Sequence, residues 1–178
     1  MPHALYLNDS YLKEADATVT ALAGDQNQFI ILDQTIFYPV SGGQAHDTGT
    51  ITHNGKTYNV LFVRKTEQGI SHQIEPSGLK IGDNVHLQID WNRRYTLMRY
   101  HTAIHVLSAA IYQETGALTT GNELDVDGAR LDVGLDNFTK ERAEAFIQKA
   151  NVALQQDLSV STYVLTKEEA LTDPSLFK

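Results

Sequence analysis

The sequence predicts an α+β protein in which a small β-barrel precedes a domain of mixed helices and strands. Short segments rich in β-branched and aromatic residues fill the first half of the 178 residues. Turn-forming residues separate these segments, and Asn54-Gly55 is the strongest turn signal. From Asp90 onward, apolar residues recur at helical spacing instead. We therefore expect a β-barrel subdomain over residues 1–89 and an α+β domain over residues 90–178.

Seven short segments of the first part have the composition of strands. Asn54-Gly55 lies between two of them and predicts a two-residue hairpin. Seven strands in close succession favour a small antiparallel barrel or sandwich. The expected strands cover residues 3–7, 17–22, 29–33, 49–53, 57–65, 69–74 and 84–90.

A long helix is expected to follow Asp90, which is a candidate N-cap, and to stop at Gly116. Its apolar positions recur three or four residues apart. They are Leu97, Ala103, Ile104, Leu107, Ala110 and Ile111.

The rest of the chain alternates between strand and helix patterns after a polar loop. We expect a strand over residues 128–135 and a helix over residues 138–157 that Thr139 caps. A strand over residues 158–166 and a last helix, limited by Pro174, complete the predicted order.

Composition excludes several classes of protein. No apolar run approaches the roughly 18 residues of a membrane helix, so no membrane partner is expected. The start of the chain lacks the basic flank and apolar centre of a signal peptide, which favours the cytoplasm. Without cysteine there are neither disulfides nor thiolate metal ligands. The net charge of −8 argues against broad, non-specific binding of nucleic acid, but it allows a local basic patch.

Two histidines four residues apart, His101 and His105, begin an apolar run of the long helix. This spacing places both imidazoles on one helix face, one turn apart. They can hold a metal ion such as zinc, or they can be two half-buried polar groups with structural partners. A zinc protease of the common helical type would need glutamate after the first histidine, where this chain has Thr102. Spacing alone leaves the first two interpretations open.

A second candidate stretch, residues 33–49, contains Gly42-Gly43. The simpler interpretation is a strand followed by a tight turn. The functional interpretation is that the glycines let backbone approach a ligand closely. Thr35 and Gln44 would then present a hydroxyl and an amide to that ligand. Both interpretations can hold together.

Arg93, Arg94 and Arg99 gather just before the histidine pair. Such a run most often forms a solvated face, but its closeness to the histidines also suggests contact with an anion. The remaining internal histidines are expected to be structural, either half-buried or at the surface. They are His46, His53, His72 and His86.

Taken in order, four stretches resemble the editing domain of alanyl-tRNA synthetase and, more closely, its free-standing AlaX-type trans-editing relatives. They are residues 32–49, 90–110, 128–133 and 138–157, so the resemblance spans nearly the whole chain. It implies a small β-barrel followed by an editing domain of the kind shared with threonyl-tRNA synthetase. It also implies a hydrolase that removes serine, and sometimes glycine, from mischarged alanine tRNA.

The resemblance assigns roles to the candidate residues, although it leaves the catalytic residue unknown. His101 and His105 match the first two zinc ligands of the family. The arginines would meet the acceptor end of the aminoacyl-tRNA. The residues that fall in the pocket motif, and so become candidates for substrate binding, are Thr35, Gly42, Gly43 and Gln44.

The chain departs from the family pattern at three points. Val40 stands where relatives often carry glutamate or another polar residue, and Ala45 where proline is common. The family's remaining zinc ligands lie in a Cys-x-x-x-His or related motif that would come after Lys178, so we expect weak zinc binding or none in these 178 residues. Two alternatives therefore stay open: a metal-free or truncated module that binds aminoacyl-tRNA, and a metallohydrolase of small esters. The oligomeric state is not predicted.

Overall fold

The computed structural model describes residues 3–26, 28–161 and 163–172. It divides into two compact units. The first comprises Met1–His101 and Asn122–Arg130, and the second comprises Thr102–Gly121 and Leu131–Lys178. The domain boundary at Asp90 stays a prediction, since compactness alone does not define a domain.

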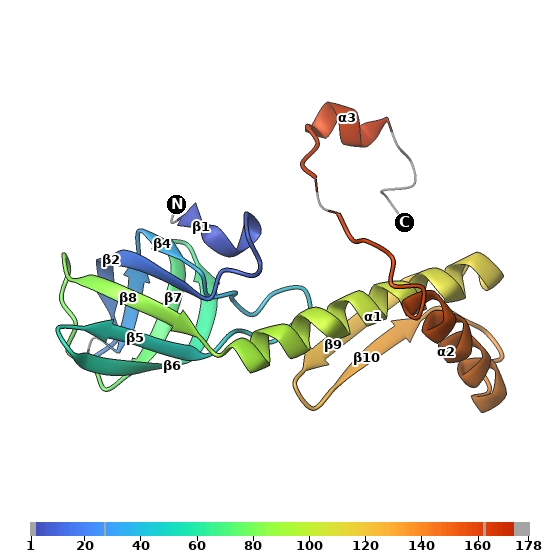
Figure 1. The fold of residues 1–178 in the computed structure, drawn as a ribbon, viewed down its shortest axis with the longest axis horizontal. Helices are drawn as coiled ribbons and strands as arrows, with labels where there is room; N and C mark the ends of the chain where they lie inside the picture. The colour runs from blue at the N-terminus through green and yellow to red at the C-terminus, as the bar shows by residue number, and fades with distance from the viewer. Residues whose placement is uncertain (1–2, 27, 162, 173–178) are drawn as a thin grey trace. The chain divides into compact units, whose positions relative to one another are not determined.

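The first unit contains a closed six-stranded β-barrel (Figure 1), so the predicted α+β class with an N-terminal barrel is confirmed. The strands follow one another around the barrel in the order β2-β3-β7-β6-β5-β8, and every neighbouring pair is antiparallel. Closure leaves no barrel strand with an unpaired edge. The bounds are Glu14–Ala23 (β2), Phe29–Leu32 (β3), Gly49–His53 (β5), Lys56–Thr66 (β6), Gly69–Glu75 (β7) and Asn84–Ile89 (β8).

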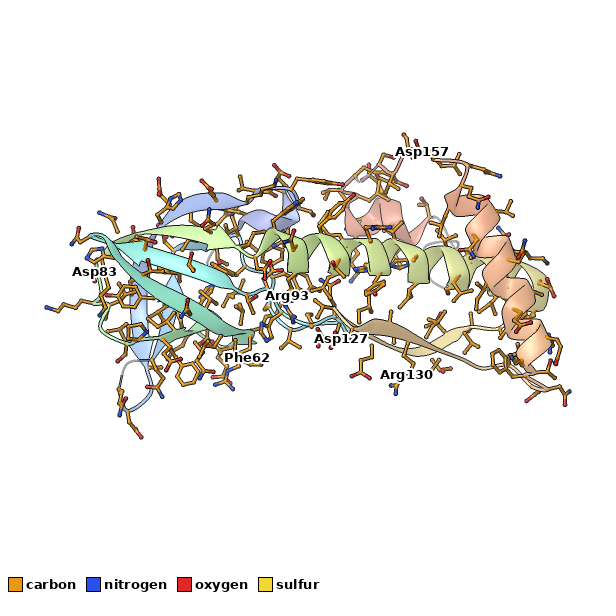
Figure 2. All side chains as sticks on the ribbon, turned by 60° about the horizontal axis from the view of Figure 1, so that its bottom comes forward. Phe62, Asp83, Arg93, Asp127, Arg130 and Asp157 are labelled. Atoms are coloured by element: carbon orange, nitrogen blue, oxygen red, sulfur yellow. The ribbon has the colours of Figure 1, made fainter. Side chains whose placement is uncertain are left out.

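Alternation along the strands builds the barrel core. On β8, Val85, Leu87 and Ile89 are buried while their neighbours are exposed. On β6, the alternation breaks between Val60 and Phe62, where the pairing with β7 shifts register. An extra residue at such a bulge re-aims the side chains that follow it. Figure 2 shows the side chains that fill the barrel.

The two-residue hairpin predicted at Asn54-Gly55 is confirmed. It joins β5 to β6, and both residues have positive φ, 48° and 78°. Positive φ at both central positions defines the type I′ turn, whose twist matches that of paired strands.

The predicted strand over residues 3–7 is wrong for most of its length. Only His3–Ala4 (β1) is extended, and it pairs in parallel with Gln34–Thr35 (β4), a short strand in the stretch where a strand is expected before the Gly-Gly turn. Leu5–Leu7 instead forms a 3₁₀ helix (η1). The turn lets Tyr6 enter the core, where its ring meets the edge of Tyr38 with centroids 5.4 Å apart.

The long helix, Trp91–Thr115 (α1), begins and ends where the sequence predicts. The Asp90 carboxylate accepts a hydrogen bond from the Arg93 amide at 3.1 Å, which caps the first turn. Gly116 has φ 70° and donates its amide to the Tyr112 carbonyl, which ends the helix. Residues of α1 up to His101 belong to the first unit, and those from Thr102 belong to the second.

Two further strands, Thr119–Asp125 (β9) and Gly128–Val133 (β10), form a two-stranded sheet. The second was predicted. The first was expected to be a polar loop, because most of its residues are polar and exposed and give no period-two apolar pattern.

The helix Lys140–Leu154 (α2) lies in the second unit and buries Phe146 and Ala150. The Thr139 hydroxyl accepts from the Arg142 amide, as the sequence predicts for its N-cap. A short helix, Lys167–Leu171 (α3), follows. No helix among the described residues is long and apolar enough to cross a membrane.

The strand expected over residues 158–166 is wrong: its described residues, 158–161 and 163–166, have no regular structure and are exposed. β-branched residues favour a strand only where a neighbouring strand can pair with them. Pro174, expected to limit the last helix, lies outside the described residues.

Candidate functional site

The Gly-Gly stretch forms a tight turn in the loop between β4 and β5. Ser41 and Gln44 exchange both backbone hydrogen bonds, at 3.0 and 3.2 Å. Gly42 and Gly43 between them have φ of 60° and 79°. A non-glycine residue is strained in this region, so the turn itself explains the two glycines.

Gly43 also permits a close approach, but to protein rather than to a ligand. A Cβ atom added there would lie 2.3 Å from the Asn122 carbonyl oxygen of β9. Around this contact, the Leu124 amide donates to the Gly43 carbonyl and the Ala45 amide donates to the Leu124 carbonyl, each at 2.9 Å. The turn is therefore held against the tip of the β9–β10 hairpin.

Arg94 and Asp47 form a buried ion pair that fixes the same loop to α1. Asp47 has no exposed surface, and Arg94 is 3% exposed. The guanidinium contacts the carboxylate through Nε and Nη2 and also donates to the Ser10 and Ile36 carbonyls, at 2.8 and 2.6 Å. Asp47 accepts a further bond from the Tyr38 amide.

The prediction that Arg94 contacts tRNA is therefore corrected. Its guanidinium is buried and bonded inside the protein, since the fourth residue of the helix faces the core. Asp47, its partner, was not singled out from the sequence, because an isolated acid carries no sign of its burial.

Gln44 and His101 join the two stretches that the sequence singled out. Gln44 Oε1 lies 2.9 Å from His101 Nδ1. An amide oxygen can only accept, so Nδ1 carries the proton and the ring's lone pair lies on Nε2. This is the tautomer that a histidine needs to bind a metal through Nε2.

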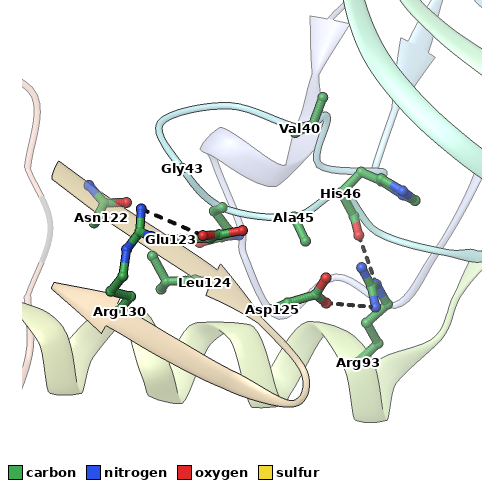
Figure 3. A pocket seen from close by; sticks show the side chains of 11 residues that line it. Val40, Gly43, Ala45, His46, Arg93, Asn122, Glu123, Leu124, Asp125 and Arg130 are labelled. Atoms are coloured by element: carbon green, nitrogen blue, oxygen red, sulfur yellow. Dashed lines mark hydrogen bonds and ion pairs between the residues drawn. The ribbon is translucent and has the colours of Figure 1, made fainter.

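Gln44 lines two cavities. The larger, about 480 Å³, is bounded by the Gly43–His46 segment, by Arg93 and by the hairpin tip (Figure 3). The smaller, about 210 Å³, reaches His101. Its lining consists of Tyr6, Leu7, Ser10, Tyr38, Gln44, Arg94, Met98 and His101.

Arg93 lies at the mouth of the larger cavity. Its Nε donates to the His46 carbonyl at 2.8 Å, and its Nη1 lies 3.3 Å from the Asp125 carboxylate. Figure 2 shows the side chain on the first turn of α1 near the hairpin tip that contains Asp127. The side chain keeps 17% of its surface exposed, unlike that of Arg94. Arg93 can therefore meet an anion, while Asp125 offsets part of its charge.

The structure brings Arg93, Gly43 and Gln44 together but does not bring Thr35 to either cavity. Thr35 has no exposed surface. Its hydroxyl accepts from the Phe37 amide at 3.1 Å and lies 2.8 Å from His72 Nε2. With the proton on His72 Nδ1, directed to the Ile30 carbonyl at 3.4 Å, every polar atom of this network has a partner.

His72 is held neutral by its surroundings. Complete burial lowers its pKa to about 4, against a smaller opposite effect of the Ile30 carbonyl. The expectation of a structural role for this histidine agrees with its burial. A charged His72 would donate through Nε2 to the Thr35 hydroxyl, whose own proton would then lose His72 as its acceptor.

Arg99 and His105 are exposed on α1. Arg99 is four residues beyond Tyr95, on the same helix face, and belongs to the first unit. His105 follows His101 by one turn and belongs to the second unit.

The described residues fit part of a zinc site. Two imidazoles one turn apart suit zinc, and the Gln44 bond gives His101 the right tautomer. A zinc ion needs four ligands, and no cluster of three or more His, Cys, Asp or Glu occurs among the described residues. The described residues therefore do not complete a zinc site, and the assignment of His101 and His105 as two of its ligands stays a prediction.

The chain is similar to known proteins over nearly its whole length. Residues 10–93 match the family model of class II (A) tRNA synthetases. The chain is 43% identical over 176 residues to alanyl-tRNA editing protein AlaX-M of Methanosarcina barkeri, covering 96% of this chain and 72% of that protein. It is 38% identical over 181 residues to AlaX-M of Saccharolobus solfataricus, covering 100% and 75%.

Alanine–tRNA ligase of Thermococcus kodakarensis is 37% identical over 170 residues, which cover 93% of this chain but 18% of the ligase. The similarity is therefore to one part of the ligase and to most of the free-standing proteins. This chain belongs to the AlaX-M family of alanyl-tRNA editing proteins.

Proposed function

We propose that this chain is an aminoacyl-tRNA hydrolase of alanyl-tRNA editing, which removes serine or glycine from mischarged alanine tRNA in the cytoplasm. The observation that carries the proposal is the hydrogen bond from His101 Nδ1 to Gln44 Oε1. It joins the pocket stretch to the histidine pair in a chain 43% identical to an AlaX-M protein.

Gln44 has two roles in this proposal. It orients the His101 imidazole, and it lines both neighbouring cavities. The Gly42-Gly43 turn fixes its backbone, since Gln44 exchanges two hydrogen bonds with Ser41 across that turn. An amino-acid hydroxyl that entered either cavity would meet polar groups already in place. Alanine would leave those groups unpaired, which is the physical basis for sparing correctly charged tRNA.

His101 and His105 would hold zinc together with ligands that the described residues do not supply. When bound, the ion would polarise the ester carbonyl or lower the pKa of a water toward about 7. Changing either histidine to alanine should lower the zinc content of the purified protein. Elemental analysis measures this without reference to activity, and stoichiometric zinc retained by the double variant would contradict the assignment.

Arg93 would position the acceptor end of the tRNA, because its guanidinium borders the larger cavity. Thr35 would act indirectly. Its hydroxyl holds the end of β4 through the Phe37 amide, so it supports the loop that carries Gln44.

The proposal is tested by measuring the release of labelled serine from alanine tRNA that has been mischarged with serine. Alanyl-tRNA and a serine ester without tRNA serve as comparison substrates. We expect release from the seryl-tRNA, little from alanyl-tRNA, and little from the small ester. Equal efficiency on both serine esters would instead indicate a small-ester metallohydrolase. RNA binding without release from any substrate would indicate a binding module.

A further inference from the structure

Three aromatic rings line up where the chain enters α1. Trp91 and Tyr95, one turn apart, stack with ring centroids 5.6 Å apart and planes 24° apart. Tyr11 also contacts Trp91, with ring centroids 5.7 Å apart and planes tilted by 45°. We call Tyr11, Trp91 and Tyr95 the aromatic strip.

The aromatic strip is packed against the protein at Trp91, while its two tyrosine rings are exposed to solvent. Trp91 packs against the barrel core, and the Tyr11 amide donates to Asp9 Oδ1 at 2.8 Å. Nevertheless Tyr11 is 62% exposed and Tyr95 is 43% exposed. Core packing accounts for the position of Trp91 but not for two tyrosine rings that remain in water. Rings held in place by packing lose little conformational entropy when a planar group stacks on them.

Two cations flank the aromatic strip. Lys13 Nζ lies 4.5 Å from the centroid of the Trp91 ring. Arg99 is exposed one turn beyond Tyr95, and within the described residues no ion pair of Lys13 or Arg99 is found. In a chain of net charge −8, two such cations beside stacked rings are a local exception.

The acidic side chains close to the strip along the chain are already engaged. Asp9 accepts from the Tyr11 amide, and Asp90 caps α1. Glu14, next to Lys13, accepts from Gln88 Nε2 at 2.9 Å and lies 3.6 Å from His86. Their charges are therefore partly satisfied within the protein.

We propose that the aromatic strip binds an unpaired nucleotide of RNA. A base extends the Trp91–Tyr95 stack on the outer face of Tyr95, and Arg99 and Lys13 contact the phosphates on either side. Stacked aromatic rings flanked by cations are the usual platform for single-stranded nucleic acid, because every base offers a π-face. The flexible stem of Lys13 lets its ammonium move from the Trp91 ring to a phosphate.

That the RNA is a tRNA rests on the proposed function, whereas the binding itself does not. Arg93 serves the cavity at the hairpin tip and is paired with Asp125. The aromatic strip is a separate surface that would add affinity and orientation without touching the ester.

Trp91 is the only tryptophan in the sequence, so its emission reports directly on the strip. The experiment titrates the protein with a short unstructured oligoribonucleotide ending in CCA and, separately, with uncharged alanine tRNA. We expect saturable quenching in both titrations. Tyr95→Leu and the Lys13→Gln, Arg99→Gln double variant should weaken binding about fivefold or more, which corresponds to the loss of one stacked base or its phosphate contacts.

Tyr163→Leu is the matched control, because Tyr163 is equally an exposed tyrosine but belongs to the second unit. It should leave binding unchanged. Midpoints rather than amplitudes are compared, and filter binding of labelled RNA repeats the measurement, since Tyr95→Leu alters the emission of Trp91 itself.

Absence of quenching by either RNA would overturn the proposal, and so would equal midpoints for wild type and Tyr95→Leu. A concentration-dependent change in emission without RNA would identify a second copy of the chain as the occupant and would also overturn it. The serine-release assay separates this proposal from the proposed function. Tyr95→Leu should raise KM at unchanged kcat if both hold, whereas normal release without quenching rejects only the aromatic strip.

Discussion

At the scale of single residues, Arg93 and Arg94 are neighbours with opposite surroundings. Arg94→Ala leaves the fully buried Asp47 carboxylate without its cation, so we expect it to lower the free energy of unfolding by about 3–5 kcal/mol. Arg93→Ala removes one backbone contact and a partly exposed ion pair, so it should cost about 1 kcal/mol. Urea unfolding of the two variants measures the difference. Equal losses would contradict the structural role of Arg94.

His72 gives stability a pH dependence. Its pKa is about 4 in the folded protein and near 6.5 when unfolded, so the unfolded chain takes up a proton that the folded protein refuses. His72 therefore leaves the free energy of unfolding unchanged above pH 6.5. It lowers that free energy as the pH falls toward 4, by about 2 kcal/mol between pH 7 and pH 5. Urea unfolding at both pH values should show a smaller loss in His72→Gln than in wild type. His3→Gln, at an exposed histidine with no carboxylate partner among the described residues, is the control and should lose as much stability as wild type.

At this scale, the sequence predicted a residue's role only where nearby residues in the sequence determine that role. The spacing of His101 and the position of Gln44 in its motif singled out two residues that the structure places 2.9 Å apart. The burial of Arg94 and Thr35 depends on contacts with residues distant in sequence, and the local sequence pattern does not reveal such contacts. Three arginines within seven residues therefore gave the same signal, although one of them is buried.

At the scale of elements, substitutions in the Gly42-Gly43 turn can distinguish the cost of backbone strain from the cost of a steric clash. Both residues have positive φ, so an alanine at either is strained by roughly 1–2 kcal/mol. Gly42 has nothing within 4 Å of an added Cβ, whereas at Gly43 that atom would meet the Asn122 backbone. We expect Gly42→Ala to cost that strain alone and Gly43→Ala to cost clearly more, because β9 would have to move.

Thermal unfolding of the two alanine variants tests this difference, and Gly42→Asn is the control. Asparagine tolerates the left-handed region, so this variant should be close to wild type. If Gly42→Ala and Gly43→Ala were equally stable, the approach of the turn to β9 would not matter for the fold.

Elements with local signals were predictable, and those that need a distant partner were not. Asp90, Thr139 and the Asn54-Gly55 turn act through their own neighbours, and all three were confirmed. The strand β9 carries polar residues and is extended because β10 pairs with it. Residues 158–166 show the converse, since β-branched residues there have no strand to pair with among the described residues.

At the scale of the whole molecule, the net charge of −8 restricts how an RNA can be held. A net negative charge disfavours phosphates on average, so we expect contact to concentrate at the cations that the two proposals use: Lys13, Arg93 and Arg99. Each phosphate neutralised changes the slope of log affinity against log salt by about −0.7 to −0.9. Three contacts predict a slope of about −2 to −3, shallow for a protein that binds nucleic acid.

Removing one of these cations should remove one contact. Arg93→Ala is expected to raise KM for seryl-tRNA, to flatten the salt slope by about 1 and to leave kcat nearly unchanged, because the residue positions RNA without reaching the ester. Serine release across a salt series, with Lys65→Ala as the control at an exposed cation of the barrel, measures all three effects. A slope much steeper than −3, or one that neither Arg93→Ala nor Arg99→Gln changes, would place the RNA on a different surface. A fall in kcat at unchanged KM would instead place Arg93 at the reacting group.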